Sequence, residues 1–167
     1  MNVADTINKI MLRKNLISLT TIFTIFILDR LSKIFIIKKT ETLDNNQIYT
    51  SKFINFDLVW NDGIGFGLFS YSSGFIYNSI TLVIIIVIAI IIYFLRNSNG
   101  YEKFSFLLIL GGALGNLFDR LFYNAVPDFI DLHINNFHWF IFNIADIFIT
   151  VGVICLILVE LFYKKKT

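Results

Sequence analysis

Charged residues, cysteine and proline are all scarce in this sequence. Only 16% of its 167 residues are charged, where a typical soluble protein has about 25%. The single cysteine, Cys155, lies in an apolar run and cannot form an internal disulfide. The net charge is only +2, and no basic patch with interleaved aromatics is present, so no nucleic-acid partner is predicted. The hydrophobic share of 56% indicates instead a membrane protein.

Long apolar segments account for the high hydrophobic content of the sequence. A helix needs roughly 20 apolar residues to cross the bilayer core. Segments that meet this length lie at about 16–37, 75–95, 104–122 and 143–163. The fold class predicted is therefore an all-α integral membrane protein, a bundle of four transmembrane helices with a small strand-rich outer segment, within a single domain of residues 1–167. The first span follows basic residues as a signal peptide would, but no small-residue cleavage site follows it, so we predict that it is retained.

Lysine and arginine gather at one set of span ends. With four spans, eight of them fall on one side: Lys9, Arg13, Lys14, Arg96, Lys103, Lys164, Lys165 and Lys166. The opposite side holds only Lys38, Lys39 and Lys52. Cytoplasmic loops carry the excess of basic residues. Both termini are therefore predicted to be cytoplasmic, with outer loops at 38–74 and 123–142.

The outer loops contain one strand pattern and one set of potential metal ligands. Alternation of apolar and mostly polar residues over 54–61 predicts a strand. The second loop holds residue types that bind zinc: Asp128, Asp131, His133 and His138. No His-Glu-x-x-His motif and no cysteine ligand accompany them, so the histidines are interpreted as surface residues. No metal and no other cofactor is predicted.

Three spans each carry an aspartate near the outer face. Asp29, Asp119 and Asp146 fall at the same depth on the same side. Ionisable residues inside spans are costly and usually functional. In the third span Gly112, Asn116 and Asp119 share a helical face, and Gly111 and Gly115 form a small-xxx-small pair that allows close helix packing. This convergence predicts a site at the outer face.

Most of the charged residues in this set have a potential partner. Asp29 and Lys33 are four residues apart in the favourable order for a helical ion pair. Because Arg and Lys partners neutralise buried acids, structural pairing is predicted for Asp29, Lys33, Asp119 and Arg120. Asp128 and Asp146 have no cation nearby in the sequence. Two carboxylates at close range cannot both ionise easily, and such a pair acts as acid and base on a water molecule. Aspartic-peptidase chemistry is therefore predicted, with a proton-coupled transporter and a membrane assembly subunit as alternatives.

Five blocks in order resemble the bacterial lipoprotein signal peptidase (signal peptidase II) family. They are DRLSK at 29–33, NDGIGFG at 61–67, GGALGNLFDR at 111–120, VPDF at 126–129 and FNIAD at 142–146. The resemblance covers about residues 16–163. Two departures are Gly65, where the family often has Ala or Ser, and Pro127, where an aliphatic residue is common.

The resemblance implies a reaction and a set of site residues. It implies cleavage of prolipoproteins just before a cysteine that carries a diacylglyceryl group, in the bacterial inner membrane, with Asp128 and Asp146 as the catalytic pair. The supporting residues within these blocks are Asp29, Lys33, Asn61, Gly63, Gly112, Asn116, Asp119, Arg120 and Asn143. The expected partners are the lipid-modified substrates and membrane lipids, and the enzyme is expected to be a monomer.

Overall fold

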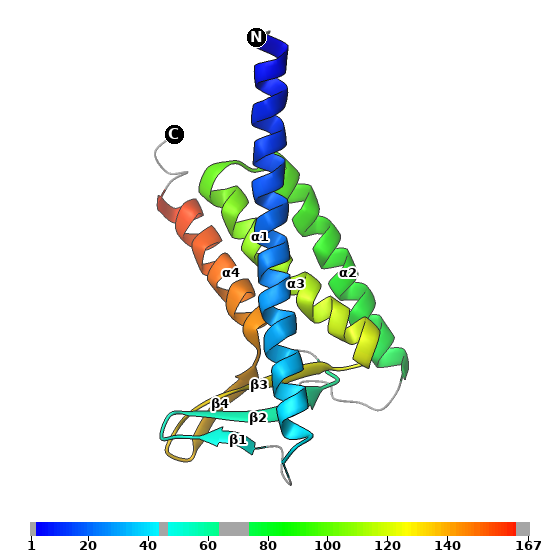
Figure 1. The fold of residues 1–167 in the computed structure, drawn as a ribbon, viewed down its shortest axis with the longest axis vertical. Coiled ribbons are helices and arrows are strands. Elements are labelled where there is room, and N and C mark those ends of the chain that lie inside the picture. The colour runs from blue at the N-terminus through cyan, green and yellow to red at the C-terminus, as the bar shows by residue number, and fades with distance from the viewer. Residues whose placement is uncertain (1–2, 44–46, 64–73, 163–167) are drawn as a thin grey trace.

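The computed structural model describes residues 3–43, 47–63 and 74–162. Within them, long helices form a bundle that carries a small sheet at one end (Figure 1). The helices are α1 (Val3–Thr40), α2 (Gly74–Asn97), α3 (Gly100–Tyr123) and α4 (Ile144–Phe162). The start of α1, the α2–α3 link and the end of α4 lie at the end of the bundle away from the sheet (Figure 1).

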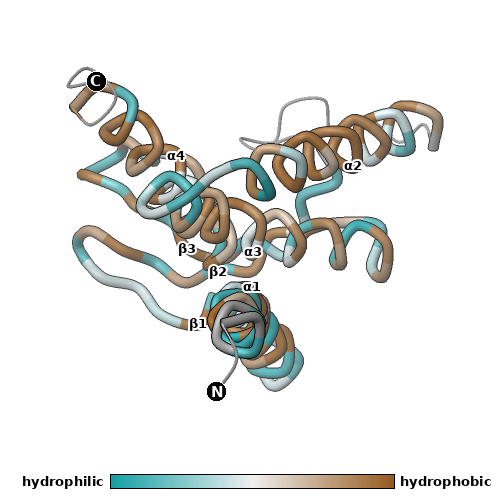
Figure 2. Tube along the Cα trace, turned by 90° about the horizontal axis from the view of Figure 1, so that it is seen from above, coloured by the Kyte–Doolittle hydropathy of each residue, from teal (hydrophilic) through white to brown (hydrophobic). Residues whose placement is uncertain are grey.

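Three of the described helices are long and apolar enough to cross a membrane. They are the stretches Phe75–Asn97, Gly100–Tyr123 and Ile144–Phe162, in α2, α3 and α4. Figure 2 shows α2 as predominantly hydrophobic along its length, and its side chains Leu82, Val83 and Ile86 are exposed. These helices agree with three of the predicted spans. The predicted first span falls within α1, which is longer than expected.

The sheet is larger than the sequence pattern predicted. Its antiparallel strands follow the order β1 (Gln47–Thr50), β2 (Ile54–Asn61), β3 (Val126–Ile134) and β4 (Phe137–Phe142). Strands β3 and β4 lie within the outer segment 123–142, for which no strand was predicted. β-branched and aromatic residues, which favour strands, are frequent in β3 and β4. Asn135, between these two strands, adopts a left-handed φ of 53°. β3 is stabilised by pairing with β2 on one side and β4 on the other.

Glycines let α3 lie close to two other helices. A Cβ on Gly111 would lie 2.9 Å from the side chain of Ile25 in α1, and one on Gly115 would lie 2.6 Å from the carboxylate of Asp29. A Cβ on Gly112 would clash with the backbone carbonyl of Ala145 in α4. The small-xxx-small prediction for Gly111 and Gly115 agrees with this packing, in which α3 contacts both α1 and α4.

Two apolar clusters fix the bundle and the sheet. Ile88 in α2 packs with Phe106 and Ile109 in α3. At the sheet end, Ile36 of α1 packs with Leu58 of β2 and Phe129 of β3. Because the second cluster ties the sheet to α1, strand β3 lies beside the helix ends that carry the acidic residues.

Candidate active site

Asp128 and Asp146 line one cavity between the sheet and the helices. Asp128 lies on β3, opposite Val59 of β2, and Asp146 lies in the first turn of α4. The cavity has a volume of about 270 Å³, and its polar lining also includes Asn61, Asn116, Arg120, Asn143 and Thr150. The structure thus brings together two carboxylates that are 18 residues apart in the sequence (146 − 128).

Hydrogen bonds at the first turn of α4 fix the position of Asp146. The Asn143 side-chain oxygen accepts a hydrogen bond of 3.1 Å from the Asp146 backbone N–H. In return, the Asn143 backbone N–H donates to the Asp146 carboxylate at 3.1 Å. This reciprocal arrangement satisfies two backbone donors at the helix start in the manner of a capping box. Asn143 therefore fixes the helix start and the Asp146 carboxylate together.

Side-chain amides, rather than cations, hold both carboxylates. Asn143 Nδ2 donates to Asp128 Oδ1 at 2.6 Å and Asn61 Nδ2 to Asp128 Oδ2 at 2.9 Å. Asn116 Nδ2 donates to Asp146 Oδ1 at 2.8 Å. In the part of the chain that the structure describes, no lysine or arginine forms an ion pair with either aspartate. The pair is thus positioned without a partner that would keep both groups ionised.

The environment of Asp128 favours its protonated form. Burial and, after it, the negative charge of Asp146 raise the pKa of Asp128, and the hydrogen bonds from Asn61 and Asn143 oppose this, with a net pKa of about 7. A carboxyl group with a pKa near 7 is protonated in a large share of molecules at neutral pH, where an ordinary aspartate is almost fully ionised. One proton held by a pair of carboxylates is the arrangement used for acid–base chemistry on a water molecule.

The remaining acids and cations of the region form a separate buried network. Lys33 Nζ donates to Asp29 and Asn116 at 2.9 Å each and to Asp119 at 2.6 Å. Arg30 lies 2.5 Å from Asp119 and 3.1 Å from Asp29. The structural pairing predicted for Asp29, Lys33 and Asp119 is therefore confirmed. Arg30, which the sequence analysis left unassigned, lies next to Asp29 and closes the network.

Two further contacts link this network to the aspartate pair. Asn116 accepts from Lys33 through its oxygen and donates to Asp146 through its nitrogen. Asp29 Oδ1 accepts a hydrogen bond of 3.0 Å from the backbone N–H of Ala145, at the start of α4. The network therefore positions α4 relative to α1 and α3.

Arg120 has a different partner from the one predicted. Its Nη2 donates to the backbone carbonyl of Gly63, and its guanidinium lies 5.6 Å from the centre of the Tyr77 ring. Within the described residues it forms no ion pair with an acid, so the structural pairing predicted for Arg120 was wrong. Gly63 also donates from its N–H to the Asn61 side chain at 3.0 Å. Arg120 thus holds the end of β2, which supplies Asn61 to Asp128.

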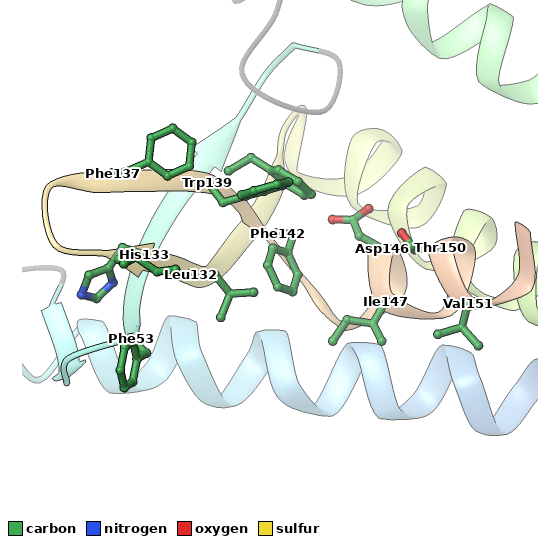
Figure 3. Close-up of a pocket in the computed structure, with 12 residues that line it drawn as sticks. Phe53, Leu132, His133, Phe137, Trp139, Phe142, Asp146, Ile147, Thr150 and Val151 are labelled. Carbon is green, nitrogen blue, oxygen red and sulfur yellow. The ribbon is translucent and has the colours of Figure 1, made fainter. Parts of the chain in front are cut away.

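A larger apolar cavity, of about 560 Å³, reaches Asp146 from the sheet side. Figure 3 shows His133 and Phe137 of the β3–β4 hairpin at one end of it and Asp146 and Thr150 of α4 at the other. Its lining is mostly aliphatic and aromatic: Phe53, Leu132, Ile134, Phe137, Trp139, Phe140, Phe142, Ile147 and Val151. An apolar ligand in this cavity would therefore lie against one member of the aspartate pair.

Part of the second sequence block lies outside the described residues. This applies to Gly65, Phe66 and Gly67, whereas Asn61 and Gly63 are placed as given above. The other predicted site residues all fall within the described ranges. Gly112 lies where α3 packs against Ala145 of α4, and the rest lie at the cavity or in the network beside it.

Comparison with known proteins then identifies the family. A family model described as signal peptidase (SPase) II matches residues 21–162. The chain belongs to the signal peptidase II family. A lipoprotein signal peptidase of Pelagibacter ubique (strain HTCC1062) is 54% identical over 160 residues, which cover 95% of this chain and 96% of that protein. Another, from Anaplasma marginale (strain Florida), is 36% identical over 93% of this chain and 90% of its own length.

The fold also resembles solved structures described as bacterial membrane enzymes. One superimposes with a TM-score of 0.72 at 31% identity, covering 86% of this chain and 87% of the other. A second has a TM-score of 0.73 at 28% identity, covering 87% and 93%. Membership of the signal peptidase II family confirms the resemblance found in the sequence, and none of these relatives supports the transporter alternative.

Proposed function

We propose that Asp128 and Asp146 are the catalytic pair of this signal peptidase II. As a member of that family, the chain is a bacterial membrane peptidase that removes signal peptides from lipoproteins. The aspartic catalytic type rests on one observation: two carboxylates line a single cavity and are held only by neutral donors, so that burial and mutual repulsion favour a shared proton. The substrate expected is a prolipoprotein cut just before its diacylglyceryl-modified cysteine.

In the mechanism we propose, one carboxylate is ionised and the other is protonated. The ionised aspartate takes a proton from a water molecule, whose oxygen attacks the carbonyl carbon of the scissile peptide bond. The protonated aspartate donates a hydrogen bond to the carbonyl oxygen. The C–N bond then breaks as the leaving amine receives a proton from the pair, which gives a carboxylate and a free amine. No step uses a metal or another cofactor.

We infer the orientation of the bound substrate from the two cavities. The smaller cavity holds the reacting groups and the side chain of Arg120, while the apolar one continues from Asp146 towards the hairpin. We place the scissile peptide in the first and an apolar part of the substrate in the second. The signal helix is expected to enter laterally between the spans.

We also propose that α1 is the fourth membrane span, with both termini cytoplasmic and the site at the outer face. The charged side chains in its outer half are buried and paired, since Asp29 and Lys33 are 0% exposed and Arg30 is 7% exposed. Its exposed side chains include the apolar residues Leu19, Phe23, Leu28, Leu31 and Phe35. Paired charges inside a bundle and an apolar surface are typical of a membrane span. The single domain is expected to act as a monomer in contact with membrane lipids.

Reporter fusions test this topology. A fusion after Thr167 is expected to give a cytoplasmic signal, and an insertion between residues 44 and 52 an extracytoplasmic one, because the basic residues concentrate at the end of the bundle away from the sheet. A cytoplasmic signal from the 44–52 insertion would contradict the orientation and the outer location of the site.

The function itself is tested by incubating the purified protein with a diacylglyceryl-modified prolipoprotein and measuring the released signal peptide. Cleavage is expected to continue in the presence of a strong chelator, because the proposed mechanism uses no metal. The same substrate without the lipid is the control. Complete loss of cleavage on chelation while the protein stays folded and still binds the substrate, with recovery on addition of zinc, would reject the metal-free mechanism.

Asn61→Ala is expected to move the alkaline limb of the pH–kcat profile upward. Asn61 donates to the Asp128 carboxylate at 2.9 Å and so stabilises the charged form. Its loss raises the pKa of Asp128, and the proton needed for catalysis is then kept to a higher pH. A lost hydrogen bond corresponds to a shift of about 0.5–1 pH unit. Asn97→Ala, at the far end of α2, is the control and should leave the limb in place. A limb that moves to lower pH would contradict the assignment.

A further inference from the structure

The β3–β4 hairpin brings together three potential metal ligands away from the aspartate pair. Asp131 and His133 lie on β3, and His138 of β4 is the cross-strand partner of His133. Their ligand atoms all lie within 4.8 Å of one another. His138 Nδ1 is 2.8 Å and His133 Nδ1 is 3.9 Å from Asp131 Oδ2. None of the three lines the cavity that holds Asp128.

Two of these side chains, one buried and one partly buried, have a polar atom without a hydrogen-bond partner among the described residues. Asp131 is 3% exposed, and its Oδ1 has no hydrogen-bond partner among the described residues. The side chain of His133 is 10% exposed, and its Nδ1 is likewise without a hydrogen bond there. Buried polar groups are nearly always satisfied, because an unmet one costs free energy. A cation bound beside Asp131 Oδ2 would give the His133 nitrogen a partner and would balance the charge of the buried carboxylate.

The surroundings of the cluster suit a cation. Asn55 Nδ2 donates to Asp131 Oδ2 at 3.2 Å, which orients the carboxylate as the outer partners of metal ligands do. Positive charge at the cluster would be stabilised by the buried carboxylate of Asp131.

We propose that Asp131, His133 and His138 bind one divalent transition-metal ion, with Zn²⁺ preferred. Two imidazole nitrogens and a carboxylate oxygen are a common ligand set for zinc, with a water molecule in the fourth position. Ligand bonds of about 2.0–2.2 Å require the three atoms to close to about 3–4 Å, a small movement of side chains. The His138 side chain is 55% exposed, which leaves a path for the ion and room for the water.

The metal would tie β3 to β4 beside the apolar cavity. His133 lines that cavity at the hairpin end (Figure 3). A bridge between the strands would fix the hairpin, and with it the wall formed by Phe137 and Trp139. The ion is thus a structural element of the substrate-facing sheet, separate from the hydrolytic step. The proposal does not depend on which residues are catalytic.

The test is zinc titration of the full chain, prepared without a polyhistidine tag and stripped of metal with a chelator that is then removed. Competition with a chromogenic chelator should show uptake of one equivalent of Zn²⁺, and zinc should raise the thermal midpoint in detergent. His138→Gln and His133→Gln are each expected to weaken zinc binding by at least ~100-fold, at or beyond the upper end of the loss typical of an outer partner. Glu41→Gln, an exposed carboxylate outside the cluster, is the matched control and should bind zinc normally.

Two results would overturn the proposal. One is that the stripped protein takes up no zinc, which would leave Asp131 and His138 as an ordinary hydrogen-bonded pair. The other is that zinc binds equally well to the folded histidine variants, which would place the ion elsewhere. His138 is exposed, so His138→Gln is expected to fold and decides the question even if His133→Gln does not. Circular dichroism of each variant checks the fold.

Discussion

Replacing either Asp128 or Asp146 by asparagine is expected to abolish release of the signal peptide while the protein remains folded. Asparagine has nearly the size of aspartate and can keep the hydrogen-bonded position, but it cannot exchange a proton with water. Loss of acid–base catalysis typically costs about 10²–10⁴ in rate. Cleavage of a lipid-modified prolipoprotein by each purified variant measures this, and binding of the uncleaved substrate should be largely retained.

The double replacement separates a catalytic pair from two independent residues. Because the two carboxylates act as one unit, Asp128→Asn with Asp146→Asn should cost little more than either single change. Effects that multiply would contradict a shared role. A folded single variant that cleaves at a near-normal rate would reject the aspartic pair, and unstable variants with partial activity would instead indicate that these acids only anchor the sheet.

Removing the charge of Lys33 is expected to have the largest effect on stability. Its side chain is 0% exposed and lies 2.9 Å from Asp29 and 2.6 Å from Asp119. Lys33→Met keeps the length and the apolar stem but leaves two buried carboxylates with Arg30 as their remaining cation. Breaking a buried pair in this way costs about 3–5 kcal/mol. A large fall in the thermal midpoint in detergent, and in the yield of folded protein, is the expected result.

A matched control and a second variant define what this result means. Lys38→Met removes an exposed lysine from the same helix and should leave the thermal midpoint nearly unchanged. Asp29→Asn should lower stability and activity together, because Asp29 holds both Lys33 and the backbone of Ala145. A stable Asp29→Asn protein with no turnover would instead make Asp29 a third catalytic residue. Normal stability of Lys33→Met would contradict the structural role of the network.

The sequence by itself determined the class of protein and predicted most of the residues of the candidate site. Apolar length predicted the three spans that α2, α3 and α4 now fill, because the bilayer sets a minimum length that no tertiary contact changes. The ion pair between Asp29 and Lys33 also followed from the sequence, since residues four apart on a helix are neighbours in any fold. Family motifs added Asp128 and Asp146, whose side chains the structure places on one cavity.

Only the tertiary structure decided which strands pair and which partners the charged side chains have. Strand pairing is non-local, so only the folded chain shows that β3 lies between β2 and β4 and carries Asp128 to the start of α4. Ion pairing is also non-local, so only the folded chain shows that Asp119 pairs with Lys33 and Arg30 of α1. It also shows that Arg120 donates a hydrogen bond to the backbone carbonyl of Gly63. The meeting of Asp131, His133 and His138 likewise depends on the register of a hairpin, which the spacing of residues along the chain does not specify.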